Sequence, residues 1–384
     1  MKPMAISSNN TGDYSGLYLH VPFCRNKKCL YCDFYSIASL AMLREWFDAV
    51  LTESDLYSSY NYNCFKKIDT LYIGGGTPSI LENKLLFAII ENIRNNFNLS
   101  ADLEITLEAN PNDITSHNLD LWHRMDINRI SLGVQSIDDK VLLFLGRSHS
   151  SEDAMNAINI ICEHGKFSLG IDLIYGYPGQ SLSEWEALLK RIIEYNPAHL
   201  SCYQLTYEDA TTLGKMKKNG LIKSLTEEEE YRFFMETSQY ISGNGYLHYE
   251  VSNYAKTYDN ISKHNLKYWQ RKPYLGLGPS AHSFDGSQRW WNVSSIKRYV
   301  KMVSSGHQPI EQYEQLTDEQ SFIETVSLGL RSPIIGICED TLSQKNKKNI
   351  EQLIYSGHLF SKEGKFFPTL KGMAVADSLS VMLV

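Results

Sequence analysis

The stretch Leu17–Phe34 reads LYLHVPFCRNKKCLYCDF and places three cysteines within nine residues. The alternation of apolar and polar residues ahead of Pro22 predicts a β-strand that ends just before the three cysteines. Cys24, Cys29 and Cys32 follow that strand, so all three can turn inward on one centre. An iron-sulfur cube held by three cysteines leaves one iron free for another ligand. A closed structural zinc site remains an alternative, with a remote fourth ligand from His20 or elsewhere.

The composition is that of an ordinary globular protein. The chain has 384 residues, 43% of them hydrophobic and 21% charged, and a net charge of -7. This charge argues against nucleic acid as the main partner, since phosphate binding usually requires a basic excess. The first residues, MKPMAISSNNTGDYSG, contain no apolar signal segment, and no apolar run is long enough to cross a bilayer. We expect a cytoplasmic protein without a transmembrane segment.

Four further cysteines, Cys64, Cys162, Cys202 and Cys338, are scattered singly along the chain. In a reducing compartment a disulfide framework is not expected. A free cysteine behaves as a small hydrophobic residue, so we expect these four to be packed thiols and not ligands.

Six short runs rich in β-branched and aromatic residues alternate with amphipathic helical stretches. The runs begin near residues 17, 69, 103, 129, 170 and 199, and each ends in a turn signal. Strands that alternate with helices form a parallel α/β sheet, either open or closed into a barrel. Binding sites in both folds lie at the carboxyl ends of the strands. The cysteines, the glycine-rich run Gly74–Pro78, Glu108 with Asn110, Gln135, and Asp172 all fall at or near such ends.

The pattern changes after about residue 226. We expect the barrel in 1–225, a barrel-covering region in 226–309, and a small C-terminal module in 310–384. The last segment reads as helix, hairpin and helix, which is typical of a winged-helix-like domain.

The cysteine motif with these strand ends resembles the radical S-adenosylmethionine (SAM) family, in the group similar to oxygen-independent coproporphyrinogen III oxidase. Within that group the chain is most similar to the heme chaperone (HemW) branch. The resemblance covers nearly the whole chain. It implies a partial parallel (β/α)6 barrel with a small C-terminal domain, and a [4Fe-4S] cluster on Cys24, Cys29 and Cys32 whose open iron binds SAM.

The resemblance also implies which other residues contact SAM. The matching positions are Tyr18, Gly75, Gly76, Thr77, Glu108, Gln135, Arg147 and Asp172, with Thr206 and His282 as weaker matches. Arg147 suits a carboxylate because its planar fork can bind both oxygens. Taken alone, GGGTP is more typical of a tight strand exit than of a ligand site, and only the cysteines reverse that preference. Isolated acids such as Glu108 and Asp172 are likewise more often capping or ion-paired residues.

Two features depart from the general pattern of that family. Four residues separate Cys24 from Cys29, where the family usually has three, so we expect the loop to bulge by one residue. Members with oxidase activity carry a cysteine two residues after the third ligand, whereas this chain has Phe34. Phe34 therefore points away from the oxidase and towards the chaperone branch.

The segment His264–Trp269, HNLKYW, matches a motif of the chaperone branch in which the histidine is implicated in heme binding. An imidazole can ligate heme iron, and flanking aromatic side chains can cover the macrocycle. A structural role is the alternative, with His264 and Asn265 bonded to a turn and the aromatic residues in the core. His248 is an alternative ligand.

Three functions follow from these observations. The first is a heme chaperone that carries a SAM-liganded [4Fe-4S] cluster and transfers heme to an acceptor protein, with a flavodoxin or ferredoxin as a further partner if SAM is reduced. The second is a radical SAM coproporphyrinogen III oxidase, an enzyme of heme synthesis that Phe34 disfavours. The third is a binding module with a structural metal. The sequence assigns no catalytic residue, and it leaves open whether SAM is cleaved.

Overall fold

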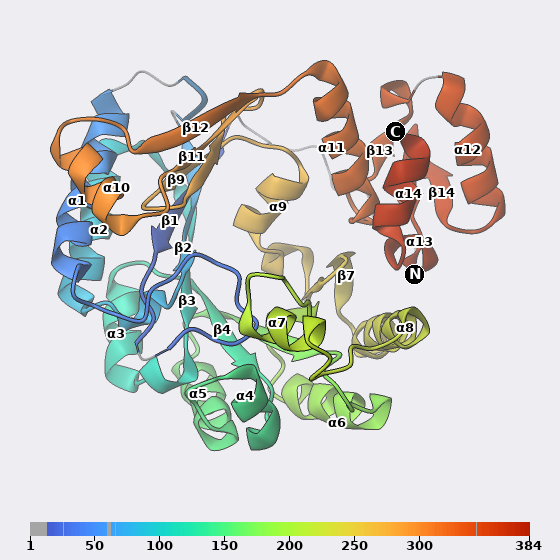
Figure 1. Cartoon of the computed structure of the whole chain (residues 1–384), viewed down its shortest axis with the longest axis horizontal. Coiled ribbons are helices and arrows are strands. Elements are labelled where there is room, and N and C mark those ends of the chain that lie inside the picture. Colours follow the sequence, from blue (N-terminus) through green and yellow to red (C-terminus); the bar gives the residue numbers. More distant parts are fainter. Residues whose placement is uncertain (1–13, 26, 60–62, 66, 343) are drawn as a thin grey trace.

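The computed structural model describes residues 14–25, 27–59, 63–65, 67–342 and 344–384. Six parallel strands form its centre (Figure 1). They are β1 (Ser15–Val21), β2 (Ile68–Gly75), β3 (Leu99–Ala109), β4 (Arg129–Gln135), β5 (Ser168–Tyr175) and β6 (His199–Gln204). These six strands confirm the predicted parallel α/β arrangement, and the sheet curves as a partial barrel.

The central strands divide their residues between two faces. Leu71, Ile73, Leu107 and Leu132 are buried with at most 1% exposure, and they belong to the main hydrophobic core. Each such side chain contributes roughly 2 kcal/mol by leaving water. The alternate positions are largely polar, because successive side chains of a strand point to opposite faces. The barrel therefore has an apolar outer face and a polar inner face.

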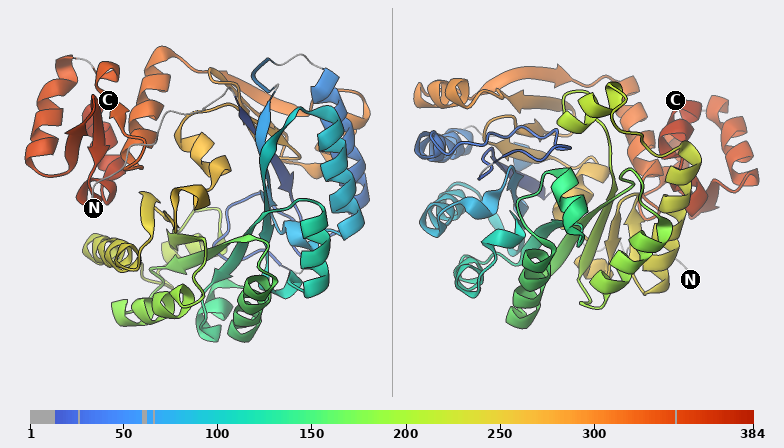
Figure 2. Two further views of the ribbon diagram at one scale, coloured as in Figure 1. Left: turned by 180° about the vertical axis from the view of Figure 1, so that it is seen from behind. Right: turned by 60° about the horizontal axis from the view of Figure 1, so that its bottom comes forward.

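Helices cover the outer face of the sheet (Figure 2). They are α1 (Leu43–Ser59), α2 (Asn83–Asn96), α3 (Ser116–Arg124), α5 (Ser151–His164) and α6 (Leu182–Ile193). Local sequence fixes where several begin: Ser150 and Ser181 form capping boxes at α5 and α6. Two shorter helices, α4 (Asp139–Leu145) and α7 (Thr212–Lys218), follow β4 and β6. Within the described residues, no helix combines the length and the apolar character needed to cross a membrane.

Residues 226–315 extend both edges of the sheet. After α8 (Glu227–Gly243), β7 (Leu247–Glu250) and β8 (Asn253–Ala255) pair beyond β6. On the other edge, β9 (Tyr274–Leu277), β10 (His282–Phe284), β11 (Gln288–Asn292) and β12 (Ile310–Gln315) continue from β1. Helix α10 (Ile296–Ser304) packs against α1, and the short helix α9 (Lys263–Trp269) packs on β1 and β2 inside the curve of the sheet (Figure 1).

The C-terminal part forms a unit with its own core. Its helices are α11 (Asp318–Leu330), α12 (Gln344–Tyr355), α13 (Leu370–Met373) and α14 (Ala376–Leu383). A small antiparallel sheet in the order β13 (Ile337–Cys338), β15 (Lys365–Pro368), β14 (Leu359–Lys362) completes it. The segment expected as this module, 310–384, also contains β12, which pairs with β11 in the large sheet. The separate core begins only with α11.

Candidate functional site

The three clustered cysteines lie on the segment between β1 and α1. All three are partly exposed free thiols. The backbone N–H of Cys32 donates to the carbonyl of Cys29 (3.2 Å), and the N–H of Cys24 donates to that of Ile37 (2.9 Å). In the described part of the chain, no three His, Cys, Asp or Glu side chains converge as ligands of one ion. The predicted loop bulge includes Asn26, which lies outside the described residues.

The end of β2 holds this cysteine segment close to the sheet. The backbone N–H of Gly76 donates to the carbonyl of Val21 (2.7 Å). A side chain at Gly76 would bring its Cβ within 2.4 Å of the Phe23 carbonyl oxygen, so only glycine fits. Gly75 has φ of +115°, a conformation that glycine adopts without strain, and its N–H donates to Glu108 Oε2 (3.0 Å). The glycine run thus connects the end of β2 with the cysteine segment through Gly76 and with β3 through Gly75.

Arg147 joins the cysteine segment to the ends of β3 and β4. Its guanidinium donates to Cys29 Sγ (3.4 Å), to Asn110 Oδ1, and to the Gly133 carbonyl (2.7 Å). Its Nε is buried without a partner among the described residues. The buried guanidinium of Arg147 therefore places a positive charge beside Cys29, one of the three proposed cluster ligands.

Two carboxyl groups lie on the polar inner face of the barrel. Glu108 accepts from Tyr72 Oη (2.8 Å), and Asp172 accepts from Ser131 Oγ (2.8 Å). Burial and, to a smaller extent, the negative charge of Asp172 raise the pKa of Glu108 from 4.5 to about 7, although the hydrogen bonds from Tyr72 and Gly75 act in the opposite direction. Burial likewise raises the pKa of Asp172. Both groups would be stabilised by a positively charged ligand, because such a ligand offsets the cost of a buried anion.

The other predicted SAM contacts near the cysteines lie on the same side of the barrel. Tyr18 Oη hydrogen-bonds with His20 Nδ1 (3.0 Å), and His20 Nε2 hydrogen-bonds with the Tyr35 carbonyl (2.9 Å). Burial lowers the pKa of His20 to about 4. Because both ring nitrogens are engaged, His20 is not placed as a fourth zinc ligand. Gln135 is buried with φ of +64° at the end of β4.

Three predicted contacts lie more loosely around this set. Thr77 is buried and accepts from Asn110 Nδ2 at 3.4 Å. Thr206 is exposed just beyond β6. His282 is exposed on β10, where its ring stacks on Trp291 with centroids 5.6 Å apart. Like all the other predicted SAM contacts, these three stay predictions.

The donor set fits the group that the sequence implies. Cysteine thiols are the usual ligands of an iron-sulfur cluster, and the partly exposed thiols of Cys24, Cys29 and Cys32 would hold one, although they do not converge on a single point in this conformation. SAM carries a sulfonium, an ammonium and a carboxylate. Two buried carboxyl groups, Glu108 and Asp172, match its positive groups, while the guanidinium of Arg147 matches its carboxylate.

The HNLKYW motif lies against the amino-terminal parts of the strands and borders the candidate site, because the His264 ring is 5.2 Å from the Tyr72 ring and 6.4 Å from the Tyr18 ring between centroids. His264 is 1% exposed, and its two ring nitrogens hydrogen-bond with Thr70 Oγ1 and Tyr268 Oη, both at 2.8 Å. Burial lowers its pKa to about 3. His248, the alternative ligand, hydrogen-bonds through both nitrogens with Ser238 Oγ and the Val251 carbonyl. In this conformation neither histidine offers a free nitrogen.

Several residues of the site were missed from the sequence. Tyr72 and Ser131 orient the two carboxyl groups, and Asn110 was noted at a strand end without a contact assigned to it. The signal that could have identified Tyr72 is its alternation with Thr70 between the apolar residues Leu71 and Ile73, since alternate positions of a strand face the same side.

The scattered cysteines are only partly as expected. Cys202 is buried and Cys64 is partly buried, whereas Cys162 and Cys338 are exposed. The expectation of four packed thiols is therefore wrong for Cys162 and Cys338, both of which lie at the end of an element near the surface.

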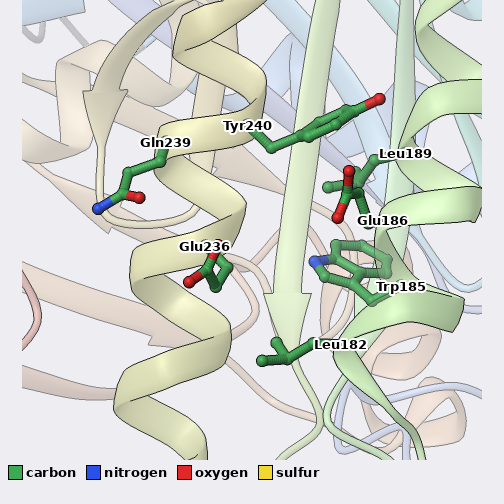
Figure 3. Close-up of a pocket in the computed structure, with 7 residues that line it drawn as sticks. All are labelled: Leu182, Trp185, Glu186, Leu189, Glu236, Gln239 and Tyr240. Atoms are coloured by element: carbon green, nitrogen blue, oxygen red, sulfur yellow. The ribbon is translucent and has the colours of Figure 1, made fainter.

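A groove of about 270 Å³ lies between α6 and α8, on the outside of the barrel (Figure 3). Its lining residues are Leu182, Trp185, Glu186, Leu189, Glu236, Gln239 and Tyr240. None of them is among the residues described above, so this groove is separate from the candidate site.

Comparison with known proteins gives consistent matches. A family model for the radical SAM superfamily matches residues 18–192. Heme chaperone HemW of Bacillus subtilis (strain 168) is 30% identical over 342 residues, which cover 88% of this chain and 89% of that protein. Heme chaperone HemW of Buchnera aphidicola subsp. Acyrthosiphon pisum (strain APS) is 33% identical over 94% of this chain and 96% of its own. The protein of that name from Escherichia coli (strain K12) is 37% identical over 69% of each chain.

The fold also matches a solved structure. Coproporphyrinogen III oxidase (HemN) from Escherichia coli, a radical SAM enzyme, superposes with a TM-score of 0.78 over 96% of this chain and 90% of its own, at 23% identity. At that identity the likeness shows the fold alone. The sequence matches extend across the barrel and, for the longest of them, nearly the whole chain. On these grounds the chain belongs to the HemW family of radical SAM proteins.

Proposed function

We propose that this chain binds heme and passes it to an acceptor protein, and that it carries a [4Fe-4S] cluster with SAM beside it. The observation that carries the proposal is the whole-chain similarity to proteins named heme chaperone, at 30% to 33% identity over about nine tenths of the chain. Phe34 supports it, since this side chain is 70% exposed where oxidase members carry a further cysteine. The acceptor is an unidentified protein, and the cytoplasm is the proposed location.

Cys24, Cys29 and Cys32 would hold the cluster. When bound, a cluster with SAM supplies one-electron chemistry, for which a flavodoxin or a ferredoxin would be the electron donor. Arg147 would bind the SAM carboxylate while it fixes the Cys29 side of the loop. Glu108 and Asp172 would receive the positive groups of SAM.

The remaining predicted contacts would shape the space around SAM. Gly75 and Gly76 would let the backbone approach the ligand closely. Tyr18, Thr77 and Gln135 would provide polar groups beside them, and Thr206 and His282 would lie at the rim. His264 is the proposed ligand of the heme iron.

One experiment separates the proposed chaperone from an oxidase. The anaerobically reconstituted chain is given SAM, a reductant and either coproporphyrinogen III or hemin. We expect stoichiometric hemin binding, weakened by His264→Ala, and no protoporphyrinogen. Formation of protoporphyrinogen would contradict the chaperone function.

A further inference from the structure

The imidazole of His264 is enclosed on both sides. One nitrogen hydrogen-bonds with Thr70 of β2 and the other with Tyr268 on the next turn of α9, each at 2.8 Å. The side chain is 1% exposed. An imidazole binds iron through a ring nitrogen, so neither nitrogen can do so while both bonds are made.

The backbone and the neighbouring side chains of α9 are fixed to the first three strands. The Glu104 carboxylate of β3 accepts from the N–H groups of Lys263 (3.3 Å) and His264 (3.1 Å). The ammonium of Lys267 pairs with Asp69 of β2 (2.7 Å). A side chain at Gly16 of β1 would place its Cβ 3.0 Å from the His264 ring. A flat macrocycle larger than any side chain has no room in this packing.

The far end of α9 is held by the C-terminal unit. The Arg331 guanidinium lies 5.6 Å from the Trp269 ring centroid and pairs with the buried Glu250 (3.1 Å). Arg271, next to α9 and in a left-handed conformation (φ of +52°), pairs with Glu324 of α11 (3.1 Å). Movement of α9 therefore involves contacts with the barrel and with the C-terminal unit.

We propose that this arrangement is a closed position of α9, and that heme reaches His264 only after α9 leaves it. The inference rests on the proposed heme-binding function and adds its regulation. Thr70, Asp69 and Glu104 are then positioning residues: they stabilise the closed position without contacting heme. Loosening of the Arg331 contact with Trp269 would accompany opening.

The affinity for heme follows from the population of the open position. The apparent dissociation constant equals the intrinsic constant divided by the fraction of open molecules. Removing one hydrogen bond from the closed position raises that fraction by about fivefold, since a net hydrogen bond is worth about 1 kcal/mol. Thr70→Val removes such a bond, preserves the side-chain shape, and leaves α9 unchanged.

The test combines hemin titration with hydrogen exchange of the amides in 261–273, on the full-length chain. We expect hemin to accelerate exchange in this segment, and Thr70→Val to tighten hemin binding by about fivefold and accelerate exchange without hemin. Thr237→Val is the matched control, because Thr237 is an equally buried threonine in α8 that accepts from Trp185 Nε1 at 2.7 Å. It should leave both quantities unchanged.

The outcomes separate the inference from the proposed function. Hemin binding with unchanged exchange in 261–273 would overturn the closed position, and so would equal hemin affinity in Thr70→Val and wild type. Failure of the wild-type chain to bind hemin at all would overturn the heme-binding function, and the regulation with it.

Discussion

Arg147 is the residue whose contacts reach furthest across the candidate site. Its identity suggested a carboxylate ligand, and the structure adds bonds to Cys29, Asn110 and Gly133. The sequence could predict the charge but not these partners, since they lie 14 to 118 residues away along the chain. One side chain thereby connects the cysteines to the barrel.

Replacing Arg147 should weaken SAM binding, because its guanidinium is the proposed partner of the SAM carboxylate. In Arg147→Ala we expect SAM affinity to fall roughly 30-fold, because charged hydrogen bonds are worth about 2 kcal/mol. Equilibrium dialysis of the reconstituted chain with labelled SAM measures this loss. Unchanged SAM affinity at equal iron content would show that Arg147 does not bind the ligand.

Glu53 of α1 is a buried acid whose burial cannot be recognised from the helical pattern of the sequence. It is 0% exposed and accepts from Tyr299, from Asn292 Nδ2 (2.6 Å) and from the N–H of Gly278 (2.7 Å). Burial raises its pKa from 4.5 to about 7. Such a residue cannot be recognised from one sequence, because the partners that make its burial tolerable come from β11, α10 and the loop after β9.

The raised pKa of Glu53 makes stability depend on pH. Between about 4.5 and 7 the folded chain holds a proton that the unfolded chain has lost, so the free energy of unfolding falls as the pH rises. Glu53→Gln lacks the titrating carboxyl group. Over that pH window its free energy of unfolding should fall by about 3 kcal/mol less than that of the wild type. Urea denaturation at several pH values measures the difference. Parallel pH profiles for variant and wild type would contradict the assignment.

At the scale of elements, the six parallel strands and their helices could be predicted because each has enough residues to show a period. The edge strands could not. β7 to β11 have three to five residues each, too few for an alternation to stand out, and their partners are distant in sequence. Helix α9 was expected to carry a heme ligand, yet its position against β1 and β2 depends on Gly16 and Thr70, whose role appears only when the elements are packed.

The contact between the end of β2 and the cysteine segment gives a prediction at this scale. Gly76→Ala would force its Cβ against the Phe23 carbonyl, so we expect a loss of about 2 kcal/mol in unfolding free energy and a reduced cluster content. Gly243→Ala is the control, since nothing lies within 4 Å of a Cβ at that helical position. It should be neutral or stabilising by up to about 1 kcal/mol. Equal iron content in Gly76→Ala and wild type would contradict the role given to this contact.

At the scale of the whole molecule, the two largest hydrophobic clusters of the described residues lie in different parts of the chain. One belongs to the barrel and the other is formed by residues from α11 onward, while two smaller clusters lie beside the barrel, around Leu145 and around Tyr249. The sequence indicated a C-terminal module from its helix and hairpin pattern, but placed its start at 310, ahead of β12. From sequence alone, a strand that joins a distant sheet cannot be distinguished from one that begins a new domain. The pairing of β12 with β11 in the structure shows that it belongs to the large sheet.

The central claim for the molecule is that Cys24, Cys29 and Cys32 hold a [4Fe-4S] cluster with one iron open to SAM. The most direct measurement is electron paramagnetic resonance of the anaerobically reconstituted, reduced chain, with and without SAM. The account predicts a cubane signal that changes when SAM is added and is lost in Cys29→Ala. A colourless protein that retains zinc through Cys29, or a cluster signal that SAM does not alter, would contradict it.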